Sequence, residues 1–159
     1  GKTGRFLPEP SPAARAAMYS WLMFVATGIG PYSGQSVHFK HFAPEPKVYA
    51  VNRYDFEAWR HWNIVDERLA SRRYMLGDSY TLVDMAVWGW ARAVTRVLDA
   101  GAWEKLPHVK RLFEEISARP AAQRAEALAK RHSFKAEYDD ETRRALFPQN
   151  ARLDGTSAA

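Results

Sequence analysis

The chain has 159 residues, a net charge of +5 and no cysteine, and 47% of its residues are hydrophobic. This length predicts one domain with a sizeable core, and the composition is unlike that of disordered chains. The lack of cysteine excludes disulfides and thiolate metal sites within the chain, and it suits a reducing cytosol. No secretory signal and no apolar run of about 20 residues is present, so we expect a soluble cytoplasmic domain that does not contact a membrane.

The positive charge does not by itself indicate nucleic-acid binding. Basic residues are scattered among acidic ones, as in Asp66-Glu67-Arg68. A binding surface for nucleic acid would gather them on one face. We therefore expect a solvated surface and no nucleic-acid partner.

The first helices are predicted from their ends. Ser11 as the cap and Pro12 at the first helical position predict a helix that ends or kinks at residues 28–31, where glycine and proline gather. A short helix over 32–42 and a turn over 43–46 follow.

A long amphipathic helix is predicted from Lys47 to about Arg73. Arg53, Glu57 and Arg60 fall on the face opposite its apolar stripe, so we expect them in solvent. The stripe recurs at spacings of three and four residues and consists of Val51, Tyr54, Ala58, Trp62, Val65 and Leu69.

Thr81 and Asp84 form the pattern of a capping box at the start of the next helix. The Thr81 hydroxyl accepts from the amide of residue 84, and the Asp84 carboxylate reaches back to the amide of Thr81. From Leu82 to Ala91, Asp84 is the only ionisable residue. We expect a helix to about Leu98 in the middle of the core, with Asp84 as a structural cap rather than a catalytic acid.

The remaining elements complete an all-α helical bundle, the predicted fold class. Gly101 breaks the chain, and prolines open helices over 107–119 and 120–131. Residues 149–159 read as a flexible tail, and the apolar pair Leu146-Phe147 is expected to pin the tail back onto the domain.

Several motifs in one order resemble the C-terminal all-α domain of the glutathione transferase family. The capping box lies in the motif G-D-S-Y-T-L-V-D. It is preceded by the motif G-R-F-L-P and followed by the motifs L-P-H-V-K-R-L and A-R-P-A. The segments from Gly30 to Phe39 and from Tyr49 to Tyr54 narrow the resemblance to the bacterial nu-class and its disulfide-reductase relatives. Spaced motifs in a fixed order are more specific than any one alone.

The resemblance implies a domain organisation and an activity. Residues 1–10 would be an interdomain linker, 11–148 the helical domain and 149–159 the tail. A thioredoxin-like domain that holds glutathione would precede the linker in a homodimeric parent enzyme. That parent would be a glutathione transferase or glutathione-dependent disulfide reductase, with an electrophile or a disulfide as second substrate. This chain alone is expected to be inactive.

Arg53 is the first candidate for binding glutathione, since arginine is suited to pairing with a carboxylate. The resemblance implies the same role for Arg53. The alternative from the residues alone is a solvated arginine that pairs with Glu57 one helical turn later. Gln35, in a loop with small residues, is a second candidate because its amide offers donors and acceptors.

Tyr32, Phe39 and Trp21 are candidate walls of a pocket for the second substrate. Their alternative is plain core packing, which we consider the better interpretation for Trp21. His38 and His41 have a spacing that suits a metal ion, but no third ligand lies nearby, and we expect no metal. The other histidines considered, His61 and His108, are expected at the surface or partly buried.

A binding module from a different functional class is the rival hypothesis. Helical domains of this kind also occur as non-enzymatic interaction modules, because a fold does not by itself fix a function.

Overall fold

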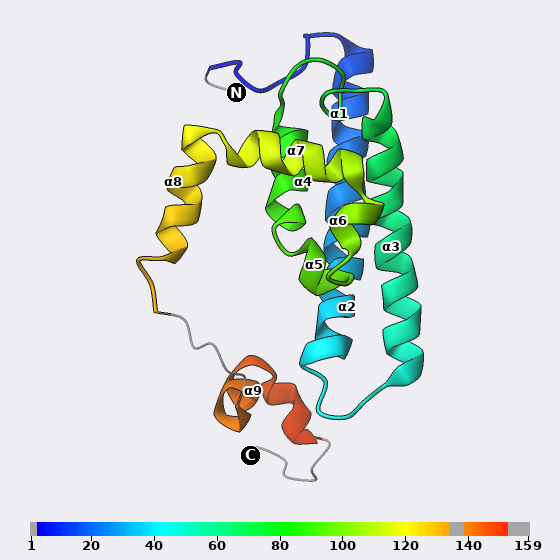
Figure 1. Ribbon diagram of the computed structural model, residues 1–159, viewed down its shortest axis with the longest axis vertical. Helices are drawn as coiled ribbons and strands as arrows, with labels where there is room; N and C mark the ends of the chain where they lie inside the picture. The colour runs from blue at the N-terminus through cyan, green and yellow to red at the C-terminus, as the bar shows by residue number, and fades with distance from the viewer. Residues whose placement is uncertain (1–2, 134–138, 153–159) are drawn as a thin grey trace. The chain divides into compact units, whose positions relative to one another are not determined.

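The computed structural model describes residues 3–133 and 139–152, and these residues form an all-α fold, which confirms the predicted fold class. The chain forms two compact units, Gly1–Arg124 and Ala125–Ala159. In the first unit, the long helices α1 and α3 run side by side (Figure 1), and α4 packs against α1 and α7. Within the described ranges, no helix is long and apolar enough to cross a bilayer. The helices are α1 (Pro12–Phe24), α2 (Gly30–His41), α3 (Val48–Ala70), α4 (Leu82–Ala91), α5 (Val94–Val97), α6 (Ala102–Lys105), α7 (Pro107–Ser117), α8 (Pro120–Ala129) and α9 (Asp140–Leu146).

Helices α1 and α2 are joined without a break by a π-helical segment, Val25–Ile29. Ser11 caps α1 as predicted, since its hydroxyl accepts from the Ala14 amide at 3.1 Å. The glycine- and proline-rich stretch was predicted to end or kink the helix, and it widens the helix instead. Pro31 lies inside this continuous helix, where it has no N–H to bond the preceding turn, and the widened segment stands directly before it.

Helix α3 buries most of its predicted stripe against α2 and α7. Ala58, Trp62 and Val65 are fully buried, whereas Val51 and Tyr54, nearer the start of the helix, are half-buried. The indole N–H of Trp62 donates to the Ser33 hydroxyl at 3.2 Å, so its one polar group is satisfied in the core.

Asp84 at the start of α4 is the polar centre of the core and is fully buried. The capping box with Thr81 is present, and the Thr81 amide donates to Asp84 Oδ2 at 2.8 Å. Its other oxygen, Oδ1, accepts from the Met75 amide at 2.7 Å. The structure thus confirms the predicted cap and adds a function: the same carboxylate fixes the loop between α3 and α4.

Helix α4 is shorter and less enclosed than predicted. It ends at Ala91, and the separate short helix α5 covers Val94–Val97. The Ala93 amide turns back to the Trp90 carbonyl at 3.0 Å, so the chain tightens there before α5 begins. Trp90 is 38% exposed. The expectation that this helix lies in the middle of the core is therefore wrong at its C-terminal end.

The segment before α1 is attached to the start of α4. The Leu82 amide donates to the Phe6 carbonyl at 3.0 Å, which satisfies a backbone donor that the first helical turn leaves free. The Phe6 ring meets Tyr80 edge-on, with 5.7 Å between ring centroids. Phe6 adopts a φ of 64°, which is unusual for a residue with a Cβ atom.

Helix α7 is capped by a side chain from α3. Asp66 Oδ1 accepts from the amides of His108 and Val109, both at 2.8 Å. A carboxylate at this end also opposes the positive end of the helix dipole. The predicted helices over 107–119 and 120–131 are both present within two residues of their expected ends.

The second unit contains α9, which begins with Asp139 as its cap. Residues Pro148–Arg152 form a 3₁₀ helix, and the rest of the predicted tail lies outside the described residues. The predicted domain boundaries and the anchoring role of Leu146-Phe147 stay predictions.

Candidate functional site

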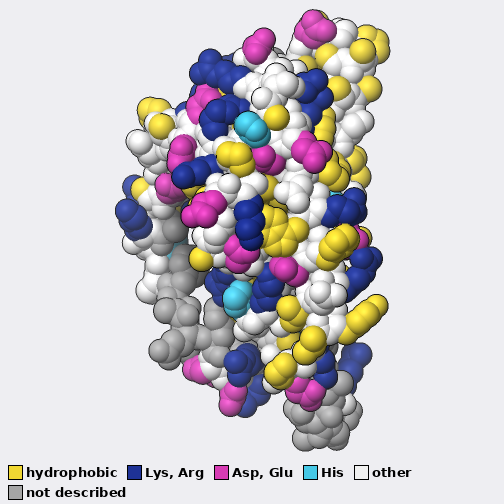
Figure 2. Space-filling view, turned by 45° about the vertical axis from the view of Figure 1, so that its right-hand side comes forward, with side chains coloured by type: hydrophobic (Ala, Val, Ile, Leu, Met, Phe, Trp, Pro, Cys, Tyr) yellow, Lys and Arg dark blue, Asp and Glu magenta, His cyan; other side chains and the backbone are white. Residues whose placement is uncertain are grey.

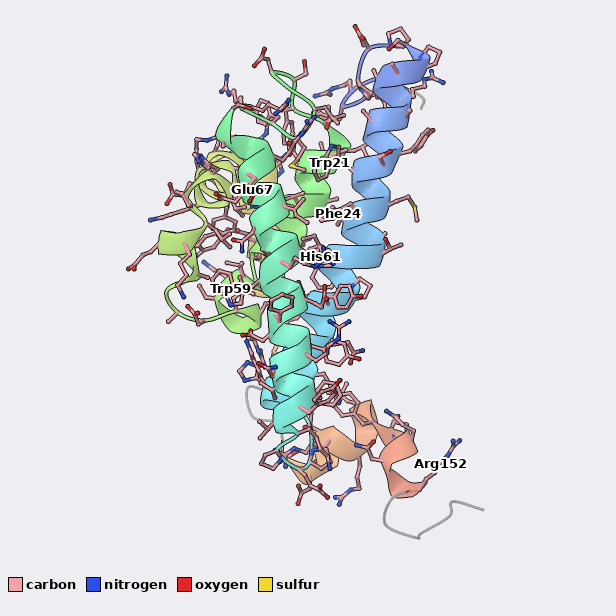
Figure 3. The ribbon with its side chains drawn as sticks, turned by 90° about the vertical axis from the view of Figure 1, so that its right-hand side faces the viewer. Trp21, Phe24, Trp59, His61, Glu67 and Arg152 are labelled. Carbon is pink, nitrogen blue, oxygen red and sulfur yellow. The ribbon has the colours of Figure 1, made fainter. Side chains whose placement is uncertain are left out.

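A continuous row of aromatic rings follows the π-helical segment along α1, α2 and α3. Figure 3 shows three of its members, Trp21, Phe24 and His61, between α1 and α3. The row runs Trp21, Phe24, His61, Tyr32, Tyr54, Phe39, and the distances between successive ring centroids are 5.4, 5.2, 4.7, 6.4 and 5.4 Å. We call these six residues the aromatic row. The structure therefore links all three predicted pocket residues in one surface.

His61 lies at the centre of the aromatic row. The residue is buried, with only 5% exposed, so the prediction of a surface or partly buried histidine is wrong. Its Nδ1 lies 2.7 Å from the Glu57 carbonyl oxygen, so Nδ1 carries a proton and donates it to that oxygen. Phe24 and Tyr32 cover the ring on the α1 and α2 side.

Gly28 makes room for His61. A Cβ atom at position 28 would lie 2.5 Å from His61 Cδ2 and 2.8 Å from Nε2. Neither distance is tolerated between non-bonded heavy atoms. The π-helical segment thus presents bare backbone to the imidazole, and such segments are frequent at functional sites.

A charged cluster of Arg53, Glu57 and Arg60 lies beside the aromatic row on α3. Arg53 Nη1 is 2.6 Å from Glu57 Oε1, and Arg60 Nη2 is 2.8 Å from Glu57 Oε2. Glu57 is 8% exposed, so the prediction that it faces solvent is wrong. A glutamate can turn back under the arginines when both of its oxygens are paired, and here they are.

The protonation states of the charged cluster follow from these pairs. The hydrogen bonds from Arg53 and Arg60 hold the pKa of Glu57 below its ordinary value, so this carboxylate is ionised. The bond to Glu57 raises the pKa of Arg53, with smaller contributions from the phenols of Tyr32 and Tyr49. Two guanidinium groups and one carboxylate leave a charge of +1 on the cluster. An anionic group is the ligand that such a surface favours.

The structure places the predicted site residues unequally. Tyr32 and Phe39 are half-buried, and Arg53 is close enough to Tyr32 for an electrostatic effect. Arg53 forms the ion pair with Glu57 that was the alternative to binding glutathione. Half of its side chain is nevertheless exposed, so it keeps hydrogen-bond donors for a ligand. Gln35 is exposed on α2 rather than in a loop.

Trp21 takes the far end of the aromatic row, where Arg68 lies 5.3 Å from its ring centroid. It is half-buried, which fits packing as well as a pocket wall. The sequence analysis did not include Phe24 or His61 in the site. It assigned Tyr54 to the apolar stripe of the long helix and not to the site. The signal for His61 was its position one turn after Glu57 and the glycine pair near residue 28.

Metal binding finds no geometric support. Among the residues that the structure describes, no three histidine or acidic side chains come together as ligands. His41 instead places Nε2 3.1 Å from the Arg96 carbonyl oxygen, and His38 meets Phe39 edge-on.

The face of the molecule seen in Figure 2 is mixed in charge, with acidic and basic side chains spread among apolar ones. This distribution differs from the continuous basic surface that nucleic acids select.

Residues 41–120 match the family model described as "Glutathione S-transferase, C-terminal domain". The chain is 38% identical to the disulfide-bond oxidoreductase YfcG of Escherichia coli over 125 residues, which cover 78% of this chain and 56% of YfcG. It is 37% identical to the disulfide-bond oxidoreductase YghU of the same organism over 132 residues, which cover 77% of this chain and 44% of YghU.

Among solved structures, a glutathione transferase from Burkholderia graminis with two glutathione molecules bound per subunit superposes with a TM-score of 0.74. It is 34% identical, and the match covers 82% of this chain and 56% of that one. The chain therefore spans about half the length of the relatives it matches.

Proposed function

Since the chain belongs to the glutathione S-transferase C-terminal domain family, we propose that its whole protein is a glutathione-dependent disulfide reductase or transferase. In this proposal the aromatic row and the charged cluster form the helical wall of the glutathione cleft. The observation that carries it is the position of Arg53 on α3, a half-exposed guanidinium in a cluster of net charge +1 beside the aromatic row. The glutathione bound to the relative from Burkholderia graminis supports the same choice of ligand.

The proposed chemistry uses a sulfur that this chain does not supply, since it contains no cysteine. The attacking sulfur would be the thiolate of glutathione, which displaces one sulfur of a substrate disulfide as a thiolate and forms a mixed disulfide with the other. A thioredoxin-like domain of the whole protein would lower the pKa of that thiol. Arg53 would orient a carboxylate of the tripeptide, and Tyr32 and Phe39 would receive the second substrate.

The assembly and the location are also proposals. Tyr19 and Met23 on α1 and Tyr49 and Phe56 on α3 are large apolar side chains that are more than half exposed. Side chains of this kind favour contact with another protein surface, and we propose a cytoplasmic homodimer. The same residues would serve a non-enzymatic interaction module, the rival hypothesis. The sequence upstream of residue 1 separates the two, since a thioredoxin-like domain is required only by the enzyme.

Arg53→Gln in the two-domain protein tests the role of Arg53. We expect glutathione to bind roughly tenfold to a hundredfold more weakly, the range for loss of one charged hydrogen bond. Thermal stability should change little, since half of the Arg53 side chain is exposed. Titration calorimetry measures the affinity.

Arg60→Gln is the matched control, because Arg60 pairs with the same glutamate. It lowers the charge of the cluster by the same amount but removes no proposed contact with the tripeptide, so the affinity should fall by less than with Arg53→Gln. Equal affinities for wild type and Arg53→Gln, with both folded, would assign Arg53 to the ion pair alone.

The 159-residue chain by itself should catalyse neither glutathione conjugation nor disulfide reduction. It contains no cysteine, and within residues 3–133 and 139–152 no β-sheet of a thioredoxin-like domain is present. Assays with purified chain, glutathione and a model disulfide check this. Turnover faster than the reaction of free glutathione with the disulfide would contradict the proposal that catalysis requires the thioredoxin-like domain.

A further inference from the structure

A pocket of about 300 Å³ lies between the segment before α1 and the loop that joins α3 to α4. Leu7 and Glu9 line it from the first segment, and Leu76, Asp78 and Ser79 from the loop. Arg68 of α3 is also part of the wall. The aromatic row and the charged cluster supply none of these residues, so the pocket is a separate feature.

The guanidinium of Arg68 is held in place from two sides. Its Nε donates to the Met75 carbonyl at 3.0 Å, and its Cζ lies over the Trp21 ring, 5.3 Å from the centroid. Among the described residues, no ion pair joins Arg68 to a carboxylate, and burial together with the charge of Arg72 lowers its pKa. A partly desolvated cation without a counter-ion is unfavourable, and a bound carboxylate would offset that cost.

Two acidic residues line the same pocket without pairing to Arg68. Glu9 accepts a hydrogen bond from the Ser11 hydroxyl at 3.2 Å, and Asp78 is exposed on the opposite wall. Apolar side chains, including Leu7 and Leu76, lie in the same wall. The pocket thus has a positive region at Arg68 and a negative region at Glu9 and Asp78, which do not pair with each other. It also has an apolar wall.

The wall that contains Leu7 and Glu9 is preformed. Phe6 just before it adopts the left-handed conformation at φ 64°, and its carbonyl is bonded to the Leu82 amide. A non-glycine residue keeps such a conformation only where its surroundings impose it, and strain of this kind gathers at binding sites.

We propose that this pocket binds a free α-amino acid with an apolar side chain. The carboxylate of the amino acid pairs with Arg68, and its ammonium group faces Asp78 and Glu9. The apolar side chain packs against Leu7 and Leu76. The pocket shares no lining residue with the proposed glutathione cleft, although Arg68 also contacts Trp21 of the aromatic row, and its test does not require catalysis.

Nuclear magnetic resonance titration of the ¹⁵N-labelled 159-residue chain tests the proposal with three probes of similar size. L-Leucine carries both charges, 4-methylpentanoate only the carboxylate, and 3-methylbutylamine only the ammonium group. We expect leucine to give saturable shifts of the Arg68 Nε–H and the Ser79 amide. Each truncated probe should bind at least about tenfold more weakly, because one charged hydrogen bond is lost.

Two substitutions locate the site. Arg68→Gln should abolish the leucine shifts, whereas Arg72→Gln, a matched change at an exposed neighbour outside the pocket, should leave them. Asp78→Asn at the exposed rim should weaken leucine binding without any effect on the thermal midpoint. The absence of saturable leucine shifts would overturn the proposal. Equal binding of 4-methylpentanoate and leucine would overturn it as well, since the acidic side chains would then have no role.

Discussion

Asp84→Ala is expected to lower the free energy of unfolding by about 3–5 kcal/mol, since it leaves two buried amides without an acceptor. The carboxylate is fully buried and bonds the amides of Met75 and Thr81 at 2.7 and 2.8 Å. It also accepts from the Thr81 hydroxyl at 3.0 Å. Loss of Asp84 therefore releases the start of α4 and the preceding loop together. Urea denaturation measures the change.

Thr81→Ala is the matched comparison, because it removes the other half of the same capping box. Only one cap is lost there, and a decrease of about 0.5–2 kcal/mol is expected. A smaller loss for Asp84→Ala than for Thr81→Ala would show that the bond to Met75 contributes nothing to stability.

The pH dependence of stability gives a second measurement on Asp84. Burial raises its pKa, although the hydrogen bonds from Met75 and Thr81 act in the opposite direction. Between the unfolded value of about 3.9 and the raised native value, the native state binds the extra proton. The contribution of Asp84 to the free energy of unfolding therefore falls as pH rises through this window and is constant above it.

Asp84→Asn isolates this effect, because asparagine does not titrate and all other carboxylates cancel in the comparison. The stability of the wild type relative to Asp84→Asn should decrease as pH rises from about 4, the lower end of the window. A difference that increases with pH would mean that the hydrogen bonds outweigh burial.

Gly28→Ala is the second large effect, with an expected loss of about 1–3 kcal/mol from overpacking. The new Cβ would meet the His61 ring at 2.5 Å. That ring cannot turn away freely, because its Nδ1 is bonded to the Glu57 carbonyl and Phe24 and Tyr32 cover it. Thermal and urea denaturation both measure the loss.

Gly34→Ala is the control in α2, where a Cβ atom has nothing within 4 Å. The same change there should stabilise the protein by about 0.5–1 kcal/mol through helix propensity. In a His61→Ala background, the cost of Gly28→Ala should shrink to within about 0.5 kcal/mol, since the two sites then no longer collide. If Gly28→Ala lowers stability equally in the His61→Ala background, then contact with the His61 ring is not the cause of the loss.

The candidate site was predictable only in part. Arg53, Tyr32 and Phe39 carry chemistry that a sequence shows, and the structure brings Tyr32 and Phe39 into one row with Trp21 and sets Arg53 close to Tyr32. Their role in binding glutathione stays a prediction. Glu57 was assigned to solvent by helical periodicity, which counts residue types and takes no account of ion pairs. Periodicity cannot show that two arginines satisfy a glutamate and so allow it to be buried.

The sequence by itself determined the longer helices, the caps at Ser11 and Thr81, and the membership of the family, because spacing and end signals are local properties of the chain. Only the tertiary structure decided the π-helical segment, the end of α4 at Ala91 and the burial of His61. Each of these depends on contacts between residues far apart in sequence. Gly28 and His61 are 33 positions apart, and it is their contact that gives the aromatic row its centre.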